Sequence, residues 1–184
     1  ILCSRSGLDY ILIHVYSISG SRFTVWIQQQ NGSGGTYTYT YTASLNMDTW
    51  YNLAIVGSVG SKWDMYIDGS TTGQVQGANT IAGITQAGNF QIGRDYASRE
   101  TPCNIDDVSI YNSAKSASEV SAIFNSGVPK DESATANLVG YWRMGEGSYW
   151  NATNWQLPDY SKQALFSQKS FQLDGVDQSI NVGN

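Results

Sequence analysis

Residues 49–70 constrain the fold most strongly, because this short stretch contains two strand patterns and two turns. Apolar side chains occupy nearly every position of residues 50–56, which predicts a central strand covered on both faces. In residues 63–68 apolar and polar positions alternate, which predicts a strand with one solvent-exposed face. Asp68-Gly69 then predicts a tight turn, because glycine readily adopts a positive φ. The stretch therefore predicts an antiparallel β-hairpin.

Two further stretches alternate with the period of a strand. Residues 22–28 place Phe23, Val25 and Ile27 on one face, and Trp26 lies on the opposite face. Residues 36–42 read Thr-Tyr-Thr-Tyr-Thr-Tyr-Thr, which predicts a strand with one face of threonine and one of tyrosine. Periodicity alone leaves open whether the tyrosine face lies on the surface or in the core.

The composition narrows the class of protein. The chain has 184 residues, of which 41% are hydrophobic and 14% are charged, so it can bury a core and carry an appendage. Its net charge is −5, and its ten Lys and Arg residues form no cluster, which argues against a nucleic acid partner. No apolar run approaches the roughly 20 residues of a membrane-spanning helix.

Residues 104–124 predict a strand over 105–111 followed by a short helix. Ser116 is the expected N-cap, with Glu119 completing a capping box and Gly127 at the C-terminal end. The run Asn-Ile-Asp-Asp-Val-Ser-Ile-Tyr-Asn-Ser-Ala-Lys-Ser-Ala-Ser-Glu-Val-Ser-Ala-Ile-Phe closely resembles a segment of laminin G-like domains, which belong to the concanavalin A-like lectin/glucanase superfamily.

Three other segments, residues 1–7, 50–69 and 89–94, are similar to strands of the same family. The resemblance implies an all-β fold, a two-sheet antiparallel jelly-roll sandwich of the concanavalin A-like kind, with one short C-terminal helix and a β-rich tail. The chain departs from the family at Lys115, where leucine is common, and at Cys103, which stands near a usual glycine.

The resemblance also suggests how the chain is divided. Residues 1–127 resemble a laminin G-like sandwich that lacks its first strands, and residues 128–169 read as a linker and lead-in segment. Residues 170–184 resemble either the first strand of a next repeat or a strand that completes the sandwich. Because sheet proteins rarely leave a strand position empty, we expect either chain upstream of Ile1 or strand exchange through 170–184 to fill it.

The chain contains two cysteines, Cys3 and Cys103, and no Cys/His cluster of the kind that binds zinc. A disulfide between them would close a loop of about 100 residues and stabilise the fold by about 4 to 5 kcal/mol. The alternative is a pair of buried free thiols.

Catalytic residues are not evident, although the superfamily includes glucanases and lyases. A retaining glucanase needs two carboxylates about 5 to 5.5 Å apart, and the glutamates fall in no such pattern; they are Glu100, Glu119, Glu132 and Glu146. A lyase would need a histidine and a tyrosine, but the only histidine, His14, is expected to face outward from a sheet. We therefore expect no enzymatic activity.

The resemblance implies one metal ligand, Asp106, which matches an aspartate that helps to hold a structural Ca²⁺ in glucanase relatives. Carboxylate and main-chain oxygens suit Ca²⁺, which takes 6 to 8 of them. The alternative is that Asp106 caps a turn or pairs with an arginine.

Aromatic side chains beside Thr, Gln and Asn provide the candidate binding surface, because this mixture suits both sugars and protein contacts. The candidate ligand-binding residues are Tyr16, Trp26, Tyr37, Tyr39 and Tyr41. The sequence thus predicts a non-enzymatic structural or adhesive module of a repeated surface or virion protein. Its expected partners are glycans or neighbouring protein subunits, and its expected location is extracellular or on a virion surface. The alternative is a carbohydrate-binding module attached to an extracellular enzyme.

Overall fold

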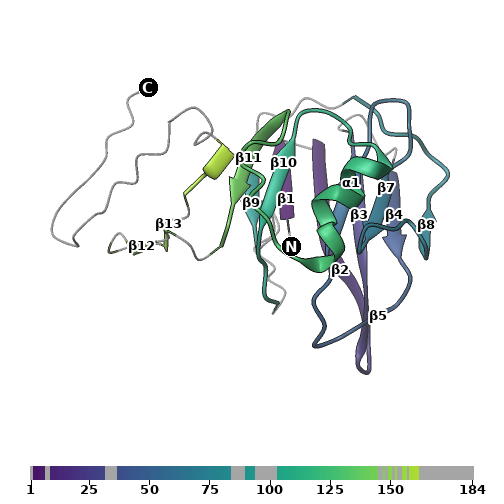
Figure 1. Cartoon of the computed structure of the whole chain (residues 1–184). Helices are drawn as coiled ribbons and strands as arrows, with labels where there is room; N and C mark the ends of the chain where they lie inside the picture. Colours follow the sequence, from purple (N-terminus) through teal and green to yellow (C-terminus); the bar gives the residue numbers. More distant parts are fainter. Residues whose placement is uncertain are drawn as a thin grey trace, which may run out of the picture.

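A computed structural model describes residues 2–6, 9–31, 37–83, 90–93, 103–144, 147, 149–150, 152, 155–156 and 158–161. The strand expected in residues 170–184 lies outside these ranges. The elements are β1 (Leu2–Ser6), β2 (Asp9–Ser19), β3 (Arg22–Gln30), β4 (Tyr37–Thr42), β5 (Leu45–Asn46), β6 (Leu53–Val56), β7 (Asp64–Ile67), β8 (Gln74–Gln76), β9 (Phe90–Ile92), β10 (Val108–Tyr111), α1 (Ala117–Phe124), the 3₁₀ turn η1 (Asn125–Gly127), β11 (Leu138–Trp142), β12 (Tyr149–Trp150) and β13 (Trp155–Gln156) (Figure 1).

A seven-stranded sheet forms the larger layer, with the order β8-β4-β3-β2-β1-β9 and with β5 paired to β3. Further pairs are β6-β7, β10-β11 and β12-β13, and all pairings among the described strands are antiparallel. The predicted fold class is confirmed: antiparallel sheets with one short helix, consistent with a concanavalin A-like β-sandwich. No helix within the described ranges is long and apolar enough to cross a membrane.

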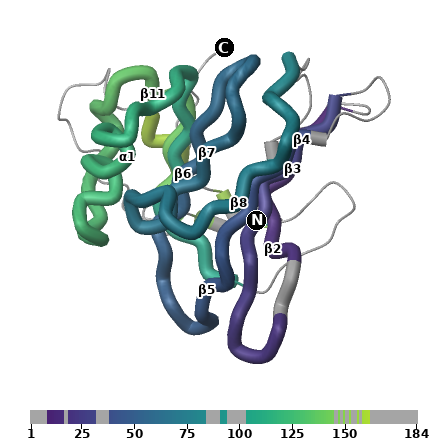
Figure 2. Tube along the Cα trace, turned by 90° about the vertical axis from the view of Figure 1, so that its right-hand side faces the viewer, coloured from purple at the N-terminus to yellow at the C-terminus, as the bar shows by residue number. Residues whose placement is uncertain are grey.

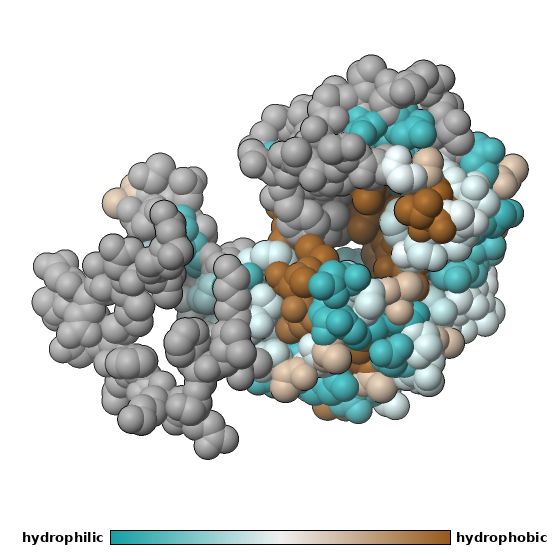
Figure 3. Space-filling model, turned by 90° about the horizontal axis from the view of Figure 1, so that it is seen from above, coloured by the Kyte–Doolittle hydropathy of each residue, from teal (hydrophilic) through white to brown (hydrophobic). Residues whose placement is uncertain are grey.

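The core lies between one face of the large sheet and the β6-β7 hairpin. Val25 and Ile27 of β3 and Met65 of β7 are its buried centre, as the alternation in residues 22–28 predicts. The partly buried residues packed around it are Ile11, Ile13, Phe23, Leu45, Leu53, Ile55, Trp63 and Ile67. Seen from above, apolar residues gather toward the middle of the molecule, with hydrophilic residues around them (Figure 3).

The hairpin differs in two respects from the prediction. Strand β6 begins only at Leu53, and Trp50, expected in a covered strand, is 66% exposed. Tyr66, expected on a wet face, is buried. Figure 2 shows why Tyr66 is buried: β6 and β7 lie between the large sheet and α1, so that both faces of the hairpin are covered. At the hairpin end, a Cβ added to Gly69 would lie only 3.0 Å from the Phe124 ring of α1.

Two glutamines close the outer edge of β7. Gln74 of β8 accepts a hydrogen bond from the Met65 backbone N–H at 2.8 Å. Gln76 donates to the Trp63 carbonyl at 2.9 Å and to the Asp64 carboxylate at 2.7 Å. These side chains satisfy backbone groups that an edge strand otherwise leaves unpaired.

Helix α1 begins as predicted and ends earlier. Ser116 is the N-cap, and Glu119 completes the capping box. The C-cap is Asn125, with φ of 47°, where the sequence suggested Gly127, because asparagine also tolerates the left-handed region. Strand β10 starts at Val108, three residues later than expected, because Asp107 has a φ of 47° and interrupts the extended backbone.

Strand β11 pairs antiparallel with β10, from Val108 opposite Trp142 to Tyr111 opposite Leu138. This strand lies in the segment expected to be a lead-in. Tyr141 is 1% exposed, and a Cβ added to Gly140 would lie 2.5 Å from the Trp142 ring. Glycine is therefore needed at position 140, because the Trp142 ring folds over its backbone.

Candidate functional site

The candidate binding residues lie on three adjacent strands of the large sheet. Tyr16 belongs to β2, Trp26 to β3, and Tyr39 and Tyr41 to β4, and all four point away from the core formed by Val25 and Ile27. Trp26 stands directly opposite Tyr41 on one side and His14 on the other. We call Tyr16, Trp26, Tyr39 and Tyr41 the aromatic face.

The rings of the aromatic face stack on one another around Trp26. Its ring centroid is 4.5 Å from that of Tyr41, with planes 11° apart, and 4.3 Å from that of Tyr16, with planes 31° apart. Tyr39 lies 5.3 Å away at 25°. Because β2 and β4 flank β3, Tyr16 and Tyr41 approach Trp26 from opposite sides. The indole is thus held between neighbours, and such ring contacts add to the free energy of folding.

Much of this surface is exposed. Tyr16 is 62% exposed and Tyr39 is 36% exposed, and Val75 of β8, opposite Tyr41, adds an apolar side chain that is 43% exposed. His14 lies edge-on to Tyr16 at a centroid distance of 5.9 Å. The backbone of Tyr37 belongs to β4, and its side chain lies outside the described part of the structure.

The opposite face of β4 is buried, which decides the alternative left open by the sequence. Thr38, Thr40 and Thr42 are all buried. Thr38 donates to the Thr80 carbonyl and Thr40 to the Trp63 carbonyl, each at 2.8 Å, while Thr42 accepts from the Val25 N–H at 3.0 Å. The threonine hydroxyls are therefore the buried partners of β4, and the side chains of Tyr39 and Tyr41 lie on the outer face.

The expected calcium ligand, Asp106, lies in an exposed loop before β10. Its carboxylate accepts a hydrogen bond from the Asp107 N–H at 3.0 Å. No group of three or more His, Cys, Asp or Glu side chains suited to a metal ion occurs among the described residues.

The neighbouring Asp107 carboxylate serves a different purpose. It accepts a hydrogen bond from the Tyr141 hydroxyl at 3.2 Å and lies 4.0 Å from the Arg143 guanidinium. Burial and the negative charge of Asp107 raise the pKa of Tyr141 to about 12. This contact ties the loop before β10 to the buried side of β11.

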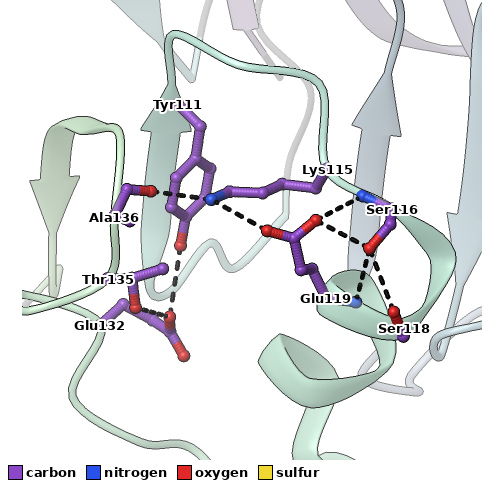
Figure 4. Close-up of polar contacts among 8 residues, drawn as sticks. All are labelled: Tyr111, Lys115, Ser116, Ser118, Glu119, Glu132, Thr135 and Ala136. Atoms are coloured by element: carbon purple, nitrogen blue, oxygen red, sulfur yellow. Dashed lines mark hydrogen bonds and ion pairs between the residues drawn. The ribbon is translucent and has the colours of Figure 1, made fainter.

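A second cluster of polar residues joins α1, β10 and the turn before β11 (Figure 4). Lys115 is buried, donates to the Ala136 carbonyl at 2.7 Å, lies 3.7 Å from the Glu119 carboxylate and stands over the Tyr111 ring at 4.5 Å. We call Tyr111, Lys115, Glu119, Glu132 and Thr135 the Lys115 cluster. No sequence pattern singled it out, although the departure at Lys115 was its one visible sign.

Glu132 is the most buried acid of the Lys115 cluster, at 5% exposure. It accepts hydrogen bonds from the Tyr111 hydroxyl at 3.3 Å and from the Thr135 hydroxyl, and its other oxygen lies 3.2 Å from the Lys130 ammonium. Burial, together with the charge of Glu132, raises the pKa of Tyr111. The contacts of Glu132 and Lys115 hold the turn that leads into β11.

Among the residues that the structure describes, the remaining predicted ones do not come together into a site. Cys103 is a free thiol, so a disulfide with Cys3 is not formed. Cys103 is also exposed, so the alternative of a buried free thiol is wrong for this residue. Glu119 serves the capping box, and its pKa is lowered chiefly by the hydrogen bond from the Ser116 backbone N–H. Glu100 and Glu146 lie outside the described ranges.

One comparison with known proteins gives a match. Residues 2–121, well over half of the chain, match the family model Laminin G 3, described as the concanavalin A-like lectin/glucanases superfamily. No curated protein and no solved structure matches the chain significantly. The match includes every strand of the large sheet, together with the hairpin, β10 and the start of α1. With the antiparallel layers and the capped helix, it shows that the chain belongs to this laminin G-like family of the concanavalin A-like superfamily.

Proposed function

We propose that the chain is a non-enzymatic structural or adhesive module of a repeated surface or virion protein, and that its aromatic face contacts a neighbouring protein subunit. One observation carries the proposal: four aromatic rings from three strands form a continuous, partly exposed surface on the sheet face opposite Val25 and Ile27. Exposed apolar patches of this kind often mark interaction sites, and Tyr and Trp are enriched in protein interfaces.

The ring arrangement favours a protein partner over a sugar for most of this surface. Sugars stack on free ring faces, whereas Trp26 is held between Tyr16 and Tyr41 at 4.3 and 4.5 Å. The stacked rings therefore offer mainly their edges, together with tyrosine hydroxyls that can donate and accept hydrogen bonds. A rigid surface with an apolar body and polar edges suits the core of a protein interface.

Glycan binding is the second candidate function, as in a carbohydrate-binding module attached to an extracellular enzyme. The specific observation in its favour is Tyr16, whose ring is the most exposed of the aromatic face and contacts Trp26 on one side. A pyranose could stack on the exposed side of this one ring, beside His14.

The partner proposal is tested by sedimentation velocity over a series of protein concentrations, with the whole chain compared with Tyr16→Ser and Tyr39→Ser variants. We expect the chain to self-associate and both variants to do so less. Lys62→Ala, on the exposed loop before β7, is the control and should leave association unchanged. A glycan array separates the alternatives: binding lost only in Tyr16→Ser supports the sugar, whereas no effect of either variant in either assay contradicts both.

We also propose a structural Ca²⁺ at Asp106, supported by its exposed carboxylate in the loop before β10. EDTA should then lower the melting temperature and excess Ca²⁺ should restore it, because an ion that binds only the folded state stabilises that state. The Asp106→Asn variant should melt at the same temperature with and without EDTA. An EDTA-independent melting curve of the unmodified chain would dispose of the site.

A further inference from the structure

Gly77, the residue after β8, lies against the ring of Tyr39. A Cβ added at position 77 would stand 3.2 Å from both Cε1 and Cε2 of Tyr39 and 3.0 Å from the Tyr39 carbonyl oxygen. Equal distances to the two sides of the ring mean that the glycine meets the ring face. Pairing of a glycine with an aromatic ring on the next strand is a known way to cover an exposed glycine backbone.

Tyr39 is consequently held from two sides. Strand β4 lies between β8 and β3, so Gly77 approaches the Tyr39 ring from one side and Trp26 from the other. Trp26 in turn contacts Tyr16 on β2. Gly77 therefore closes one end of a row of contacts that crosses four strands and ends at the exposed ring of Tyr16.

The backbone around Gly77 has little freedom to withdraw. The Gly77 N–H donates to the Tyr39 carbonyl at 2.8 Å. In the following segment, residues 78–83, the Thr80 and Ala82 carbonyls accept hydrogen bonds from Thr38 and Gln29 at 2.8 and 2.7 Å. Ile81 of the same segment is buried and bonded to the Ser61 carbonyl at 2.7 Å. A Cβ at position 77 would crowd both the Tyr39 carbonyl oxygen and the Tyr39 ring, and the partly exposed ring is the group that can move away.

We propose that Gly77 is a positioning residue of the aromatic face: by allowing the Tyr39 ring to lie flat beside β8, it keeps that ring stacked against Trp26. The inference deepens the proposed function, because the flat surface offered to a partner depends on this one glycine. Its structural part, the effect of position 77 on ring stacking, stands independently of any partner.

The test compares Gly77→Ala with Gly83→Ala. The control glycine belongs to the same loop, and a Cβ added there would meet no atom within 4 Å. The first measurement is the circular dichroism band that arises from exciton coupling between stacked aromatic rings. We expect Gly77→Ala to weaken this band while the sheet signal stays unchanged, and Gly83→Ala to leave both as they are. An undiminished band in a folded Gly77→Ala variant would overturn the inference.

A double-mutant comparison shows whether the effect passes through Tyr39. In a Tyr39→Ser background, Gly77→Ala should produce no further loss of the band, because the displaced ring is already absent. A further loss of the same size would mean that position 77 acts on the sheet itself, which contradicts the proposal. Should Gly77→Ala fail to fold, recovery of folding in the double variant supports the inference, and failure of both variants overturns it.

Sedimentation of Gly77→Ala then separates this inference from the proposed function. A weakened exciton band with reduced self-association supports both. A weakened band with unchanged association leaves Gly77 as a positioning residue and removes the role of the aromatic face in contacts between subunits.

Discussion

The aromatic face and the Lys115 cluster both bring several side chains into contact, but they do so in opposite surroundings. In the aromatic face the rings come from neighbouring strands of one sheet and remain partly exposed to solvent. In the Lys115 cluster, the charged groups of Lys115 and Glu132 are withdrawn from water, whereas Glu119 of α1 remains exposed (Figure 4). Buried charges need partners, whereas exposed rings can lose theirs at small cost.

The two regions should differ in how well they tolerate substitution. Removal of a ring from the aromatic face leaves a gap that water can enter, and the backbone pairing of β3 with β4 is unaffected. Removal of a hydrogen-bond partner of Lys115 or Glu132 leaves a buried polar group without that partner. We therefore expect the two regions to respond very differently to substitution.

The largest expected effect comes from Glu132→Ala. The change leaves the partly buried hydroxyls of Tyr111 and Thr135 without their acceptor, which should cost about 2 to 3 kcal/mol of unfolding free energy. Urea denaturation measures the loss. Lys130→Ala removes the exposed partner of the same carboxylate and should cost less than about 1 kcal/mol. Equal losses in the two variants would refute the asymmetry between buried and exposed partners.

An intermediate effect is expected for the triple variant Tyr37→Ser, Tyr39→Ser and Tyr41→Ser. Cross-strand pairs on an exposed sheet face contribute roughly 0.2 to 1 kcal/mol each, so the domain should stay folded and lose about 1 to 2 kcal/mol. Circular dichroism shows whether the variant is folded, and thermal melting measures the loss of stability. Thr40→Val, on the buried face of β4, removes a single hydrogen bond and should cost about 1 kcal/mol. Complete unfolding of the triple variant would show that the tyrosine face is essential to the fold.

The smallest effect concerns Glu119, the exposed member of the Lys115 cluster. Its pKa in the folded state is lowered from the ordinary value of 4.5, so the stability it contributes is present above pH 4.5 and is lost as the pH falls through the lowered pKa. Glu119→Gln should therefore be less stable than the unmodified chain at pH 7, and the two should converge in acid. Melting temperatures from pH 7 to pH 2 measure this, and a difference that grows in acid would have the wrong sign.

Local sequence patterns correctly predicted the parts of the fold that depend on residues close together in the sequence. The capping box of Ser116 and Glu119 and the burial of Val25 and Ile27 follow from spacing alone, and both are confirmed. The alternation in β4 predicted a tyrosine face and a threonine face but could not say which one is buried. That choice depends on residues 63 and 80, distant in sequence, whose carbonyls accept from the threonines.

The contacts that local patterns missed are those between distant segments. Tyr111 meets Glu132 only because the turn before β11 brings residues 132–136 back to β10. Gly77 gave no signal, since its role depends on the Tyr39 ring of the adjacent strand. The late start of β10 could not be predicted either. Asp107, whose left-handed backbone interrupts the strand, contacts Tyr141, which is distant in the sequence.

Gln74 and Gln76 of β8 affect whether another molecule can add a strand at the edge of β7. An open strand edge acts as a template on which another molecule can add a strand, and repetition of that step produces fibrils. At β7 the amides of Gln74 and Gln76 already occupy the backbone groups of residues 63 and 65. Addition of a strand from another molecule at these two backbone groups would first have to displace the glutamine amides.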